Sequence, residues 1–189
     1  MGGIMVAGTR EPSPQGAALA RHVGYEIASR KLMLITGGAP GIDTEALLGA
    51  IEAGGRIWLI LPWVEPPPFR HIQELLSKAK QVGFHRYHLN NAVIFVRAAM
   101  YNKPRFGDVA FEVRTELAVE EADKVVVVEA KTPKPDWGWG TYHAVKYAVR
   151  RGKPVYIFEP LVDDQRVREA FSTLTSLGAK PIRSLDEAL

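Results

Sequence analysis

The sequence contains no cysteine, which excludes a disulfide scaffold, thiolate catalysis and zinc–thiolate sites. It has no apolar stretch long enough to cross a membrane, and its N-terminus leads directly into a predicted strand, so we expect neither a membrane segment nor a signal peptide. These absences fit a reducing compartment, and we expect the protein to be cytoplasmic. The chain has 189 residues, of which 47% are hydrophobic, so we expect a single domain over residues 1–189 with a sizeable core.

Several enzyme motifs are also absent. No Gly-x-Gly-x-x-Gly run follows the first predicted strand, no Gly-Lys-Ser/Thr triplet occurs, and no serine lies in a Gly-x-Ser-x-Gly elbow. The side chains of His85 and His88 would diverge on a strand, and no third metal ligand is evident. We therefore predict no redox dinucleotide enzyme, no P-loop hydrolase, no catalytic residue, no metal site and no cofactor.

The most informative segment is residues 34–43, Leu-Ile-Thr-Gly-Gly-Ala-Pro-Gly-Ile-Asp. A short apolar run ends there in a glycine loop, and apolar residues at helical spacing begin at Ile42. Glycines let the backbone approach an anion, and the free amides and positive dipole of a helix N-terminus attract one. We therefore expect a nucleotide or phosphate site at Gly37, Gly38, Ala39, Gly41, Ile42 and Asp43. The alternative is a tight turn that binds nothing.

A second loop of this kind follows residues 4–8, Ile-Met-Val-Ala-Gly. Ligands of open parallel sheets bind at the carboxyl ends of the strands, so the two loops are expected to face one crevice. We predict that Gly8, Thr9 and Arg10 contact the ligand there. The Arg10 guanidinium can fork onto a phosphate, or it can be a solvated surface group.

A third glycine loop, Trp137-Gly138-Trp139-Gly140-Thr141, precedes another predicted helix. We predict that Gly138, Gly140 and Thr141 offer amide and hydroxyl donors to a phosphate or sugar. The two tryptophans can stack on a base, or they can close the end of the core or a dimer interface.

Asp43 and Arg114 each have two interpretations. Asp43 lies at a helix start, where it can cap the helix or accept a hydrogen bond from a ribose or base edge. Arg114 lies in the predicted helix before a run of four valines. It clamps a phosphate if it points toward the glycine loops, and otherwise it is a surface arginine paired with an acid on its own helix.

Net charge is only +3, but basic residues are concentrated between residues 69 and 105. This segment has seven basic residues and one acidic residue, Glu74, interleaved with five aromatic residues. Such a pattern is typical of single-stranded nucleic-acid binding, through phosphate neutralisation and base stacking. The alternative is a solvated face whose aromatic side chains point into the core.

Alternating apolar runs and helical patterns predict an α/β fold, a Rossmann-like open and mostly parallel sheet with helices on both faces. The expected strands are 4–7, 32–36, 57–61, 124–129, 154–158 and 179–182. The expected helices are 14–30, 42–53, 69–82, 109–121, 141–151 and 164–177. Residues 84–107 stay unassigned, because Asn90-Asn91 can form a hairpin turn or cap a helix over residues 92–101.

These motifs resemble those of the DprA/Smf DNA-processing proteins. Gly8-Thr9-Arg10, followed by Ser13-Pro14 and Gly16, is similar to the first loop of that family. Residues 37–43 and 49–55 resemble its most distinctive run, and the similarity continues at residues 111–114, 125–130 and 140–141. It covers roughly residues 4–160. The family's Arg-Asn-Arg triplet is matched only at Arg114, because Thr115 and Glu116 replace its other two members.

The resemblance implies a Rossmann-like domain that binds single-stranded DNA, forms a homodimer and hands DNA to a RecA-type recombinase during transformation and recombination. It implies phosphate contacts at Arg10, Gly37, Gly38 and Arg114. Residues 136–144 also align with the Pro-Gly-Gly-x-Gly-Thr-x-x-Glu loop of the LOG-type nucleoside-monophosphate phosphoribohydrolases. Ala144 replaces the glutamate that such chemistry needs.

The sequence therefore predicts a module that holds single-stranded DNA or a nucleotide across loops 8–13, 37–43 and 137–141, with the basic segment extending the track. The alternatives are a sensor or phosphoribohydrolase for a small nucleotide, and a scaffold dimer whose pocket is vestigial.

Overall fold

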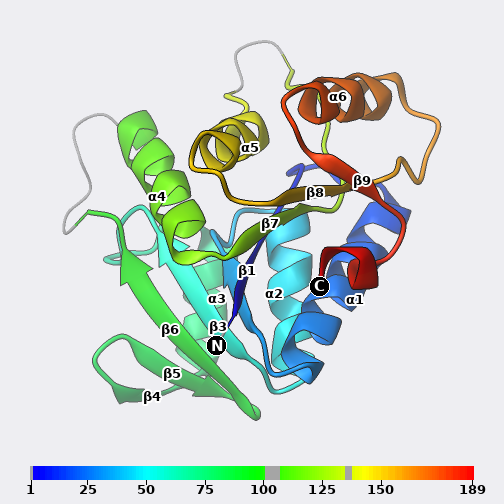
Figure 1. Cartoon of the computed structure of the whole chain (residues 1–189). Coiled ribbons are helices and arrows are strands. Elements are labelled where there is room, and N and C mark those ends of the chain that lie inside the picture. Colours follow the sequence, from blue (N-terminus) through cyan, green and yellow to red (C-terminus); the bar gives the residue numbers. More distant parts are fainter. Residues whose placement is uncertain (1, 101–106, 135–137) are drawn as a thin grey trace.

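The computed structural model describes residues 2–100, 107–134 and 138–189 (Figure 1). Within these residues nine strands form one sheet in the order β4-β5-β6-β3-β2-β1-β7-β8-β9. The strands are β1 (Gly3–Ala7), β2 (Met33–Thr36), β3 (Arg56–Leu61), β4 (Lys80–Gly83), β5 (Arg86–Leu89), β6 (Ala92–Ala98), β7 (Lys124–Val127), β8 (Val155–Phe158) and β9 (Lys180–Ile182). Only the pairs β4–β5 and β5–β6 are antiparallel. The predicted α/β, Rossmann-like and mostly parallel fold is confirmed.

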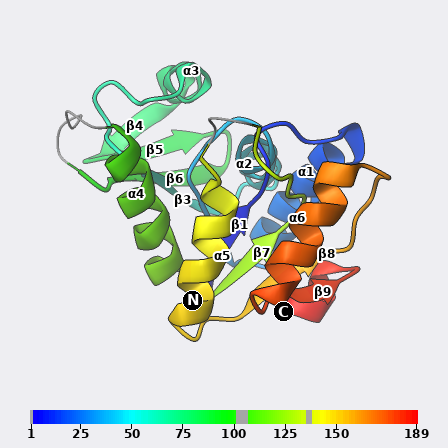
Figure 2. The same ribbon diagram turned by 90° about the horizontal axis from the view of Figure 1, so that it is seen from above.

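Helices cover both faces of this sheet, as Figure 2 shows from above. They are α1 (Pro14–Ser29), α2 (Ile42–Glu52), α3 (Arg70–Lys78), α4 (Gly107–Glu121), α5 (Gly140–Arg150) and α6 (Gln165–Ser176), followed by a short 3-10 helix, η1 (Leu185–Ala188). Successive β1 side chains face opposite ways. Ile4 and Val6 pack with α1 and α2, whereas Met5 and Ala7 pack with α4, α5 and α6. This is why β1 is apolar throughout.

Two glycines allow α1 and α2 to pack closely. A Cβ on Gly24 would lie 2.0 Å from the Ala46 carbonyl oxygen, and one on Gly49 would lie 1.9 Å from that of Arg21. No side chain fits at either position, so both residues must be glycine for the helices to reach this distance.

Within the segment left open by the sequence, the described residues 84–100 contribute β5 and β6 to a β-meander with β4 at one edge of the sheet. Asn90, with φ of 53°, and Asn91 make the turn between β5 and β6, so the hairpin interpretation is the observed one. The predicted helix over residues 69–82 ends at Lys78, because the backbone of Ala79 is extended and Lys80–Gly83 pairs with β5. Pairing with a neighbouring strand overrides the helical periodicity there.

The helices of the described chain are all too short or too polar to span a membrane.

Candidate functional site

A cleft of about 650 Å³ opens at the carboxyl ends of β1, β2 and β7, which are neighbours in the sheet. In the sheet, β2 lies on one side of β1 and β7 on the other. Crevices of open α/β sheets form at such a point, where the order of the strands reverses direction. Nine of the predicted site residues line the cleft: Gly8, Thr9, Arg10, Ala39, Asp43, Arg114, Gly138, Gly140 and Thr141. The three loops therefore converge on one site.

The other four predicted residues lie behind the cleft wall and shape it. Gly38 and Gly41 have φ of 62° and 86°, a conformation that side chains disfavour. Gly37 lies against the Arg114 side chain. Ile42 is fully buried, and its N–H, the first amide of α2, donates to the Thr9 carbonyl at 3.1 Å. That amide joins two loops, and direct ligand contact at these four positions stays a prediction.

Other backbone amides of these loops also donate hydrogen bonds within the protein. The N–H of Gly38 donates to Thr36 Oγ1 at 3.3 Å, that of Ala39 to Asp43 Oδ2 at 3.4 Å, and that of Thr9 to the Glu129 carbonyl at 2.7 Å. These amides are therefore not free to bind an anion in this structure.

Arg114 points from α4 toward the glycine loop of residues 37–43. It is 7% exposed, and its Nη1 lies 3.8 Å from Asp43 Oδ2. A Cβ on Gly37 would lie 1.2 Å from this Nη1, so the guanidinium occupies space that only glycine leaves free. Its Nε is buried without a partner, and no hydrogen bond joins the guanidinium to any other described residue. Burial lowers the pKa of Arg114, and the charge of Asp43 partly offsets that effect.

Asp43 and Arg10 complete the floor of the cleft. The Asp43 carboxylate turns inward to the loop amide of Ala39, and burial raises its pKa against the opposing charge of Arg114. Arg10 is exposed and makes no ion pair with another described residue. Thus, among the described residues, Arg114 is buried without a hydrogen-bond partner and Arg10 is exposed to a ligand in the cleft.

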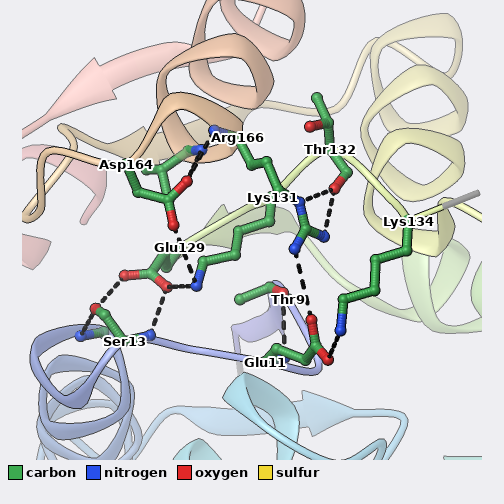
Figure 3. Close-up of polar contacts among 11 residues, drawn as sticks. Thr9, Glu11, Ser13, Glu129, Lys131, Thr132, Lys134, Asp164 and Arg166 are labelled. Atoms are coloured by element: carbon green, nitrogen blue, oxygen red, sulfur yellow. Dashed lines mark hydrogen bonds and ion pairs between the residues drawn. The ribbon is translucent and has the colours of Figure 1, made fainter.

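The first loop is held by Glu129, which the sequence analysis did not single out. This buried carboxylate accepts hydrogen bonds from the backbone N–H and the hydroxyl of Ser13, at the start of α1 (Figure 3). A Cβ on Gly16 would lie 2.5 Å from Glu129 Oε2, so this glycine makes room for it. An acid directly after four valines was the available signal, because a charge at a buried strand end needs partners.

Two further cations that the sequence analysis missed, Lys131 and Arg166, line the same cleft. Lys131 Nζ lies between Glu129 and Asp164, at 3.9 and 3.7 Å from their carboxylates. Arg166 donates to the Thr132 carbonyl at 2.9 and 2.6 Å, and its Nη1 lies 3.6 Å from Glu11 Oε2. These pairs join the first loop, the end of β7 and the start of α6 (Figure 3). Their positions depend on chain segments far apart in sequence, so no local pattern reveals them.

The third loop is attached to the first. The Thr141 hydroxyl donates to the Gly8 carbonyl at 3.0 Å. Trp139 packs against the core and stacks on Tyr142, with ring centroids 5.1 Å apart, and its buried Nε1 has no hydrogen-bond partner among the described residues. Trp137 lies outside the described residues. Ala144, at the position of the hydrolase glutamate, is buried in the cleft wall and offers no carboxylate.

None of the described residues between 69 and 105 lines the cleft. Arg70 pairs with Glu74, and Arg97 pairs with Glu121. Tyr101, Lys103 and Arg105 lie outside the described residues, so an extension of the track along this segment stays a prediction. His71, however, supports the second loop from α3, because its Nε2 lies 2.9 Å from the Gly38 carbonyl oxygen and 3.0 Å from Thr44 Oγ1.

The sequence profile of a family described as DNA recombination-mediator protein A matches residues 2–189. No match was found among curated proteins. Among solved structures, DNA processing protein A (DprA) from Streptococcus pneumoniae superposes with a TM-score of 0.72 and 20% identity, over 99% of this chain and 60% of that one. The chain thus spans less than two thirds of that protein's length.

Two other solved structures share the fold. DNA processing protein A from Helicobacter pylori, described for its single-stranded DNA binding mode, gives a TM-score of 0.73 with 17% identity over 99% of this chain and 78% of that one. The molybdenum cofactor carrier protein from Chlamydomonas reinhardtii gives 0.61 with 19% identity over 98% and 91%.

Proposed function

Because the chain belongs to the DNA recombination-mediator protein A family, we propose that it binds single-stranded DNA in the cleft as part of DNA processing and recombination. One observation carries the proposal most directly: Arg114 is buried at the cleft without a hydrogen bond to any described residue. A buried guanidinium in this state is costly, and a phosphate oxygen of a ligand would satisfy it.

The mechanism is electrostatic capture without bond chemistry. Arg114 holds one phosphate at the floor of the cleft, and the exposed Arg10 contacts the same or the next phosphate. Each phosphate that the protein neutralises releases condensed counterions, so affinity falls as salt rises. The fixed loops set the position of the nucleic-acid backbone. Contacts to phosphates do not depend on the bases, so they do not make binding sequence-specific.

Two finer points of the family resemblance are part of the proposal. We propose that the protein acts as a homodimer and that the bound strand passes to a RecA-type recombinase. The family membership supports both points.

Fluorescence anisotropy of a labelled oligothymidylate across a salt series tests the proposal. Arg10→Ala is expected to weaken binding about tenfold, the effect of one lost charge-assisted hydrogen bond, and to reduce the log–log salt slope by about 0.7. Arg151→Ala is the matched control, since Arg151 is exposed, pairs with Glu120 and does not line the cleft. Salt-independent binding, or equal slopes for the wild type and Arg10→Ala, would contradict the proposal.

A further inference from the structure

The floor of the cleft contains an acid beside its arginines. Asp43 lines the cleft at 8% exposure, and its Oδ2 lies 3.8 Å from Arg114 Nη1 and 3.4 Å from the Ala39 amide nitrogen. Any phosphate that Arg114 binds must therefore lie close to this carboxyl group.

The charged groups that face Asp43 come from different elements. Arg114 approaches from α4, and Arg10 from the loop after β1. His71, from α3, contacts the same glycine loop at the Gly38 carbonyl and Thr44. Lys131 and Arg166, which also line the cleft, are each paired with acids. Arg10, Arg114 and an ionised Asp43 together carry one positive charge. That charge matches a phosphodiester, which carries one negative charge, whereas a phosphomonoester carries about 1.5 to 2 at pH 7.

We propose that Asp43 makes the cleft selective for the internal phosphodiesters of a nucleic-acid strand and against terminal phosphomonoesters. This inference rests on the proposed function, because it concerns the phosphate that Arg114 holds.

The physical reason is charge repulsion in a site shielded from water. Burial already raises the pKa of Asp43, so a further anion nearby must either be repelled by the carboxylate or force it to take up a proton. Either outcome weakens ligand binding. The loss is larger for the monoester, because it carries more negative charge than the diester and one positive charge does not neutralise it. At an effective dielectric typical of protein sites, a fractional charge a few ångströms away changes affinity about tenfold.

The test uses two ligands that differ by one methyl group: thymidine 5′-monophosphate and its methyl ester, a diester. Each competes with a labelled, unphosphorylated oligothymidylate. For the wild type at pH 8, we expect the diester to bind about tenfold more tightly than the monoester. This preference is expected to shrink below pH 6, where the monoester loses its second charge.

Asp43→Asn keeps the shape and a carbonyl acceptor for the Ala39 amide, and it is expected to reduce the preference to about twofold or less at pH 8. Glu112→Gln is the matched control, since Glu112 is an exposed acid on the same cleft. Solvent screens its charge, so its loss is expected to leave the preference within about twofold of the wild-type value. Circular dichroism and thermal melting verify that both variants fold, and the wild-type pH series tests the inference without any variant.

Equal wild-type affinities at pH 8, tighter binding of the monoester, no binding of the diester, or an unchanged preference in folded Asp43→Asn would each overturn the inference. The oligothymidylate titration in the same experiment separates the two proposals. If the oligonucleotide does not bind, the proposed function fails. If it binds but the ligand preference is absent, only the role of Asp43 fails.

Discussion

At the scale of single residues, the position of Arg114 depends on what Gly37 lacks. The guanidinium fills the volume that a Cβ would take, so the glycine is needed for space, since its φ is not among the positive values found in this loop. Gly37 in the glycine loop therefore makes room for the Arg114 side chain, in addition to any contact of the loop with a ligand.

Gly37→Ala tests this dependence. Because the new methyl group would coincide with Nη1, Arg114 must leave the cleft floor, and affinity for oligothymidylate is expected to fall at least about tenfold. Anisotropy titration measures the loss. Gly83→Ala is the control, since its nearest atom beyond the chain neighbours is a comfortable 3.8 Å away and it lies in β4, outside the cleft. Wild-type affinity in folded Gly37→Ala would show that the position of Arg114 does not matter.

At the scale of elements, sequence patterns predict those strands and helices that are determined by interactions between residues close in sequence. The strand–loop–helix units were predictable because burial on both faces requires apolar strands and glycines mark their ends. The end of α3 was not predictable, since its residues keep helical spacing and the competing strand β5 lies further along the chain. Likewise, Glu129, Lys131 and Arg166 enter the site only through contacts between distant segments. The direction of Arg114, left open by its helix, is fixed by the tertiary packing of α4.

The packing of α1 on α2 gives a prediction about stability. Gly24→Ala places a methyl group 2.0 Å from a backbone oxygen of α2, so the helices must separate. We expect the free energy of unfolding in urea to fall by about 2 kcal/mol, because overpacking outweighs the better helix propensity of alanine. Gly138→Ala, with no atom within 4 Å of the added Cβ, is the control. A Gly24→Ala protein as stable as the wild type would mean that the two helices separate at little cost.

At the scale of the whole molecule, the sheet order determines where a ligand can reach. The strands extend from β1 to both sides, and the cleft lies over this central point. A strand longer than this cleft must therefore continue onto another surface. A second protomer would supply such a surface.

Light scattering during size-exclusion chromatography tests the proposed homodimer. The expected mass is twice the 20.9 kDa of one chain, at protein concentrations down to the micromolar range. A mass of one chain throughout the dilution series, with oligonucleotide binding intact, would show that a single protomer suffices.

The three loops are bonded directly to one another, through Ile42 to Thr9 and through Thr141 to Gly8. A strand that enters the cleft consequently meets described loop residues that are already bonded to one another, which lowers the ordering cost of association. Most of the conformational entropy lost on binding must then come from the nucleic acid. A duplex is stiffer than a single strand and would present a different surface to the cleft. The protein side of the contact would stay almost unchanged.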